Sequence, residues 1–93
     1  MDTNAEQRVL RCKSSTDANK LAGSIYATYH ADTISPIVVR VIGAGALNQA
    51  VKASIICNKF FAKKGIAVYL KPSFQDACKD MTAIELKIIC QKE

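Results

Sequence analysis

A glycine turn at the end of a β-branched run is the feature that most constrains the fold. The run PIVVRVI covers residues 36–42, and Gly43-Ala44-Gly45 follows it directly. Continuous β-branched runs are typical of strands that are buried on both faces. Apolar residues at helical spacing come next, so we predict a helix that begins near residue 44 and continues to Lys64, where Gly65 ends it.

A strand and a helix precede this unit. RVLRCK, residues 8–13, alternates between apolar and polar side chains and is a predicted strand. Apolar residues then recur at helical spacing over about residues 16–30. We expect Ser15 to cap this helix, with Asp17 near the positive end of its dipole. Residues 1–7 are polar and are predicted to be a flexible extension of a single domain, residues 8–93.

Two alternating segments follow the second helix. GIAVYLKP, residues 65–72, and TAIELKIIC, residues 82–90, are predicted strands joined by a polar loop over residues 72–80. The order is therefore β-α-β-α-β-β, with an antiparallel last strand. Because strand–helix–strand connections are right-handed, both helices are expected on one face of a four-stranded mixed sheet. The predicted fold class is α+β with two layers.

The net charge of the chain limits the classes of binding partner that we expect. Lys and Arg number 13 against 8 Asp and Glu, which gives a formal charge of +5. A polyanion such as nucleic acid or anionic lipid is therefore a better partner than a cation. The sequence contains neither a signal-peptide pattern nor the run of about 18 apolar residues that a membrane span needs. We expect no membrane partner and a cytoplasmic location, or a nuclear one in a eukaryote.

Metal and catalytic chemistry are not predicted. Cys12, Cys57, Cys78 and Cys90 form no CxxC pair, and the single histidine, His30, is distant from them in sequence. The first, second and fourth cysteines are typical of small core residues, whereas Cys78 lies in a polar loop and is expected to be an exposed thiol. His30 has no evident nucleophile partner, so we expect neither an enzyme nor a cofactor.

The glycine turn lacks a nucleotide-cofactor motif but suits a single phosphate. A dinucleotide fingerprint would require glycine where Asn48 stands, and no P-loop pattern occurs. A helix N-terminus nevertheless presents free N–H groups, and glycines allow close approach of an anion. Asn48 and Gln49 lie in the first helical turn, and Lys52 lies one turn later. Alternatively, Gly43 and Gly45 only permit a left-handed turn and close packing of the helix.

The first predicted strand ends at the edge of the sheet where the glycine turn is also expected. Lys13 is its last residue, and Ser14 and Ser15 follow. Loops that follow parallel strands lie at one edge, where ligands collect in open α/β sheets. We therefore expect Lys13, Ser14 and Ser15 to lie near residues 43–48 and to share an anionic ligand with them.

The second helix has a predicted apolar face and a lysine stripe on the opposite side. The apolar face comprises Leu47, Ala50, Val51, Ser54 and Phe61. The stripe contains Lys52, Lys59 and Lys63, with Ile56 among them. A lysine stripe can be an ordinary solvated face. An apolar side chain within it indicates cover by another subunit, so Ile56 and Lys59 are candidate interface residues.

Four segments of the sequence resemble the stage V sporulation protein S family: IGAGALNQAVKA at 42–53, KSS at 13–15, LAG at 21–23 and TAIELKI at 82–88. The resemblance covers residues 8–90. The fold of that family is similar to Alba chromatin proteins and to the C-terminal domain of translation initiation factor three, as is the predicted element order. The resemblance implies nucleic-acid binding by a dimer and places Lys13 where an Alba-like lysine contacts nucleic acid.

Two functional hypotheses follow. In the first, a dimer binds DNA or RNA phosphates with little sequence specificity, through Lys13, Ser14, Ser15, Gly43, Gly45, Asn48, Gln49 and Lys52. In the second, the GAGALNQ turn belongs to an interaction or regulatory module. There it forms a subunit interface or binds a small anionic ligand.

Overall fold

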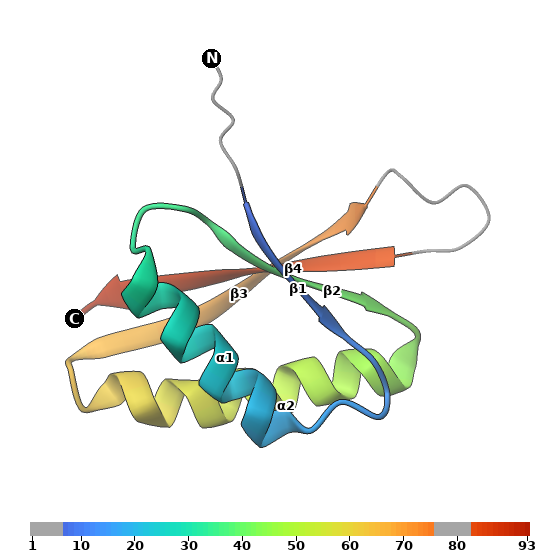
Figure 1. Cartoon of the computed structure of the whole chain (residues 1–93), viewed down its shortest axis with the longest axis horizontal. Helices are drawn as coiled ribbons and strands as arrows, with labels where there is room; N and C mark the ends of the chain where they lie inside the picture. The colour runs from blue at the N-terminus through green and yellow to red at the C-terminus, as the bar shows by residue number, and fades with distance from the viewer. Residues whose placement is uncertain (1–6, 76–82) are drawn as a thin grey trace, which may run out of the picture.

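The computed structural model describes residues 7–75 and 83–93, which form a two-layer α+β fold (Figure 1). The elements are β1 (Arg8–Cys12), α1 (Ala18–Ala31), β2 (Ile37–Ile42), α2 (Ala44–Ala62), β3 (Ile66–Gln75) and β4 (Ala83–Lys92). The predicted order β-α-β-α-β-β is confirmed. Most of the predicted extension at residues 1–7 and the thiol of Cys78 lie outside the described residues.

The four strands form one mixed sheet in the order β1-β2-β4-β3. β1 runs parallel to β2, whereas β4 is antiparallel to both β2 and β3. The sequence predicts the direction of β4 but not its place inside the sheet. β3 is an edge strand that continues to Gln75, so the prediction that it ends at Pro72 is wrong. Proline is tolerated there because an edge strand need not donate every backbone hydrogen bond.

Both helices cover one face of the sheet, as predicted, and the core lies between the layers (Figure 1). Leu21 and Ile25 of α1 and Phe61 of α2 are buried against inward-facing strand residues such as Val39 and Leu86. The rings of Tyr26 and Tyr29 pack against Phe61 at centroid distances of 4.9 and 5.0 Å. This aromatic cluster holds the C-terminal halves of the two helices together.

The start of α1 differs from the prediction. Its N-cap is Asp17 rather than Ser15, and the carboxylate accepts hydrogen bonds from the N–H groups of Asn19 (2.8 Å) and Lys20 (3.3 Å). Thr16 stabilises the preceding turn instead, because its Oγ1 accepts from the N–H of Lys13 at 2.8 Å. Ser15 therefore remains exposed in the loop.

The buried face of α2 is also different. It consists of the small residues Ala46, Ala50, Ala53 and Cys57, together with Phe61. Of the predicted face, Val51 is 39% exposed, and Leu47 and Ser54 are only half-buried. The prediction gave weight to large apolar side chains, whereas alanines allow this helix to approach the sheet closely. The Cys12 thiol marks that approach, since it donates to the carbonyl oxygen of Ala46 at 3.4 Å.

Asp32 organises the loop between α1 and β2. Its carboxylate accepts from the Ser35 hydroxyl at 2.7 Å and from the N–H groups of Ser35 and Ile34 at 3.0 Å each. Arg8 adds an ion pair at 3.2 Å. These bonds favour the charged form, and together, with the Ser35 hydroxyl first, they hold the pKa of Asp32 well below its usual range.

We expect Asp32→Asn to lower the free energy of unfolding at neutral pH. A depressed pKa stabilises the fold above the unfolded-state value of about 3.9 and loses that effect as the pH falls toward the folded value. Urea denaturation of both proteins should therefore show a constant difference from pH 7 to pH 5, which shrinks below about pH 4. A difference that does not change with pH would contradict this role of the charge.

Candidate nucleic-acid interface

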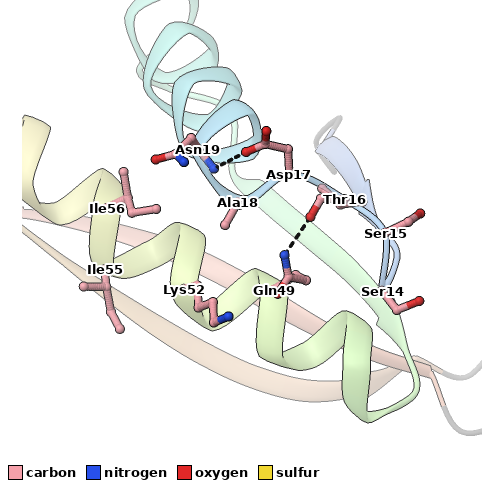
Figure 2. A pocket seen from close by; sticks show the side chains of 10 residues that line it. All are labelled: Ser14, Ser15, Thr16, Asp17, Ala18, Asn19, Gln49, Lys52, Ile55 and Ile56. Atoms are coloured by element: carbon pink, nitrogen blue, oxygen red, sulfur yellow. Dashed lines mark hydrogen bonds between the residues drawn. The ribbon is translucent and has the colours of Figure 1, made fainter.

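The loop between β1 and α1 packs against the first turn of α2. A Cβ atom at Gly45 would lie 2.8 Å from the Cβ of Ser14, which is too close for two carbon atoms that are not bonded. Gln49 strengthens the contact, since its Nε2 donates to the carbonyl oxygen of Thr16 at 2.8 Å (Figure 2). The predicted proximity of the two turns is confirmed, and Gly45 serves close packing.

Gly43 has a different role. It is the N-cap of α2, and its φ of 93° and ψ of 157° belong to a region that only glycine adopts readily. No side chain of the described residues caps this helix end, and the first intrahelical bond runs from the N–H of Leu47 to the carbonyl of Gly43. The N–H groups of residues 44–46 thus lack an intrahelical partner and carry partial positive charge. Gly43, Ala44 and Gly45 are all exposed.

Only one of the two helix N-termini at this edge is open. The Asp17 carboxylate occupies the end of α1, where it already accepts two backbone hydrogen bonds. Asp17 also brings a negative charge to the rim of the site. An anion that binds at this edge would therefore approach α2 rather than α1.

An open hollow of about 660 Å³ separates the start of α1 from α2 (Figure 2). Ser15, Asp17 and Asn19 line one side, and Gln49, Lys52 and Ile55 line the other. Lys52 is the lysine that α2 contributes to this hollow, and its side chain is exposed. The hollow therefore places one cation near the hydroxyls of the neighbouring loop, the amides of Asn19 and Gln49, and the carboxylate of Asp17.

Most of the predicted binding residues are accessible at this edge. Lys13, Ser14, Ser15, Gly43, Gly45, Asn48 and Lys52 are exposed, whereas Gln49 is half-buried and bonded to Thr16. A second hollow, of about 530 Å³, shares Ser14 with the first and is also lined by Lys13, Arg11 and Arg40. Sequence reasoning missed the two arginines. Arg11 stands at a polar position of an alternating segment, and Arg40 is the one charged residue in the apolar run at 36–42, and these were the signals that could have indicated them.

The candidate interface residues of α2 separate in the structure. Ile56 packs partly against the core, whereas Lys59 is exposed. The apolar side chain that projects most from the helix is Ile55, which is 57% exposed. Val51 and Ile55, one helical turn apart, are thus exposed apolar side chains of α2, and the interface at Ile56 and Lys59 stays a prediction.

The sequence model of the family described as Stage V sporulation protein S (SpoVS) matches residues 8–91. The chain belongs to the SpoVS family. It is therefore related to sporulation proteins, and the resemblance drawn from the four sequence segments is confirmed. In this SpoVS chain the segment at residues 42–53 covers the end of β2, the Gly43 turn and the first half of α2. The most recognisable part of the sequence thus coincides with the uncapped helix end.

Three further observations concern the chemistry of the described residues. Within residues 7–75 and 83–93, no helix of this SpoVS protein is long and apolar enough to cross a membrane. The same residues contain no group of three His, Cys, Asp or Glu side chains that could hold a metal ion. Burial, followed by the neighbouring Cys90, raises the pKa of the Cys57 thiol to about 12, so this side chain is a thiol at neutral pH.

The glycine contact can be tested by adding one methyl group. Gly45→Ala should lower the free energy of unfolding by about 1–3 kcal/mol, because the new Cβ displaces the loop at Ser14. Gly23→Ala is the matched control: a Cβ there meets nothing within 4 Å, and alanine should stabilise the helix by about 0.5–1 kcal/mol. Urea denaturation measures both effects.

A second-site variant separates packing from backbone strain. Ser14→Gly/Gly45→Ala should recover part of the loss, because it removes the Cβ that lies closest to position 45. Equal stability of Gly45→Ala and Gly23→Ala would show that the close approach does not constrain this position.

Proposed function

We propose that this protein binds DNA or RNA through the phosphate backbone, with little sequence specificity, at the edge formed by residues 13–15 and 43–52. The observation that carries the proposal is the exposed and uncapped N-terminus of α2, held beside the loop that contains Lys13. Helix N-termini of this kind are ready-made sites for phosphate oxygens. A formal charge of +5 favours a polyanion as their source.

Each residue would have a distinct contact. The N–H groups of the exposed Ala44 and Gly45 would donate to one phosphate, and the exposed hydroxyls of Ser14 and Ser15 would donate to the same or the next one. Lys13 and Lys52 would supply charge on either side. Contacts of this kind position a nucleic-acid backbone but do not distinguish bases, which supports weak sequence specificity.

The competing hypothesis of a subunit interface at the glycine turn has less support. It requires the amides of Asn48 and Gln49 to bond to a partner, but the Nε2 of Gln49 already donates to Thr16 within the chain. A small anion at the same helix end remains compatible with the geometry. Self-association is better supported on α2 at Val51 and Ile55, which are exposed, and Ile55 also lines the hollow that contains Lys52, so this interface would adjoin the binding edge. We therefore propose a homodimer in which α2 supplies the interface.

The Lys13→Glu/Lys52→Glu variant tests the binding edge. Fluorescence anisotropy with labelled duplex DNA and single-stranded RNA should show at least tenfold weaker binding at about 50 mM salt. The slope of log K against log salt should fall by about 2 for the duplex, one unit for each lost phosphate contact.

Lys63→Glu/Lys64→Glu is the charge-matched control. These lysines lie at the C-terminal end of α2, about 28 Å from its N-terminus by helix rise. This control should retain affinity within about threefold. Failure of the unmodified protein to bind at low salt, or equal losses in both variants, would refute the proposed edge.

The dimer proposal makes a separate prediction. Light scattering during size exclusion should give twice the chain mass of 10.1 kDa, and Ile55→Glu should give the monomer, because a buried charge would disrupt an apolar interface. Ile34→Glu is the control, since Ile34 is 91% exposed in the loop before β2. A monomeric unmodified protein, or dissociation by both variants, would contradict an interface on α2.

A further inference from the structure

The face of the sheet opposite the helices carries a band of cations. Because side chains alternate along a strand, residues that are paired in register share one face. Arg11 lies directly opposite Arg40, and Lys71 lies directly opposite Lys87. Arg40 lies beside Glu85, two residues before Lys87, so both pairs are on the same face.

The two cationic pairs form a diagonal from β1 to the edge strand β3. Three strand spacings of about 4.8 Å and one two-residue step of about 6.7 Å give a band about 16 Å long. Arg11, Lys71 and Lys87 are exposed, and none of them forms an ion pair with a side chain in the described parts of the chain. Glu85 is already held by Arg40, whose Nε lies 2.7 Å from Oε2.

This arrangement is unfavourable for the isolated domain. Like charges directly opposite each other on neighbouring strands destabilise a sheet. Lys71 and Lys87 form such a pair, and neither is bonded to a carboxylate in the described parts of the chain, whereas Arg40 beside Arg11 is already compensated by Glu85. An anionic occupant would relieve the repulsion, whereas a second copy of the same face would increase it.

The cationic band continues into the edge described above. Lys13 and Ser14 line the hollow of about 530 Å³ together with Arg11 and Arg40. A chain of phosphates that leaves the loop at Lys13 can therefore pass over the end of β1 onto the open face of the sheet. The described residues that line this hollow include no carboxylate, and the carboxylate of Glu85 on the open face is paired with Arg40.

Tyr69 adds a surface for a base. It lies two residues before Lys71, on the same face of β3, and is 51% exposed. Its hydroxyl makes only a long contact, 3.4 Å, to the Glu93 carboxylate. Aromatic side chains on open, basic sheets stack against the bases of single strands. An acidic protein has no bases to stack, so this side chain favours nucleic acid as the occupant.

We infer that the open sheet face is a second contact surface, on which Arg11, Arg40, Lys71 and Lys87 bind the phosphates of a single nucleic-acid strand and Tyr69 stacks a base. This inference rests on the proposed function. It extends the site from a single edge to a path around β1.

The Lys71→Glu/Lys87→Glu variant tests the phosphate contacts. Binding of a labelled RNA of about 12 nucleotides should weaken at least tenfold, and the salt slope should fall by about 1.4, or 0.7 for each single-strand contact. Lys63→Glu/Lys64→Glu, with the same change of charge, should stay within about threefold. Circular dichroism checks that each variant is folded.

Tyr69 variants test the stacking contact. Tyr69→Ala should weaken binding of the single strand by about fivefold or more, with little change for a duplex of the same length. Tyr69→Phe keeps the ring and should bind like the unmodified protein. Loss of binding in Tyr69→Phe would overturn the stacking role, because it would assign the effect to the hydroxyl.

Stability provides an independent readout. Lys71→Glu alone should raise the melting temperature, since it places opposite charges on the two strands, and yet weaken RNA binding. An unchanged or lower melting temperature would overturn the claim that the cations cost stability and are retained for a ligand.

The outcomes separate this inference from the proposed function. If Lys71→Glu/Lys87→Glu binds RNA normally while Lys13→Glu/Lys52→Glu does not, the open face is excluded and the edge remains. If the unmodified protein binds no nucleic acid, both fail. If polyglutamate of equal charge displaces the RNA as well as unlabelled RNA does, the face accepts acidic proteins and the inference of a nucleic-acid strand is wrong.

Discussion

Ser14 packs so closely against α2 that no side chain fits at Gly45. This contact holds the loop after β1 against the start of α2. The hydrogen bond from Gln49 Nε2 to the carbonyl oxygen of Thr16 is a second point of attachment. Lys13 is thereby placed beside a helix end that no side chain of the described residues caps. Both the phosphate site at this edge and the cationic path onto the open sheet face depend on that placement of Lys13.

The two helices of this SpoVS-family chain have different roles. Asp17 neutralises the N-terminus of α1, so this helix contributes to packing rather than to anion binding. α2 approaches the sheet through small residues, with Ala53 and Cys57 fully buried, and ends at a cluster of aromatic rings. A helix anchored along its length and at its far end can leave its N-terminus uncapped, because its stability does not depend on a capping side chain.

The order of elements was predictable because alternation, helical spacing and glycine punctuation agree along the chain. The position of β4 was not, because pairing between distant strands leaves no local pattern. Pro72 and the alanine face of α2 were misread for a related reason: edge position and close helix packing are tertiary properties. The glycine turn could be located from the sequence, but only coordinates separate the backbone role of Gly43 from the packing role of Gly45. The opposed cations of the open sheet face become visible only when the register is known.

All of the proposed contacts depend on phosphate binding by backbone N–H groups at the start of α2. Backbone amide chemical shifts of isotope-labelled protein, followed during titration with a short RNA at about 50 mM salt, report on these groups one by one. Large, salt-sensitive shifts are expected for the amides of Ala44 and Gly45, accompanied by those of residues 13–15, with little change at Lys63 and Lys64. If the RNA binds while the amides of Ala44 and Gly45 do not move, this helix end does not bind phosphate.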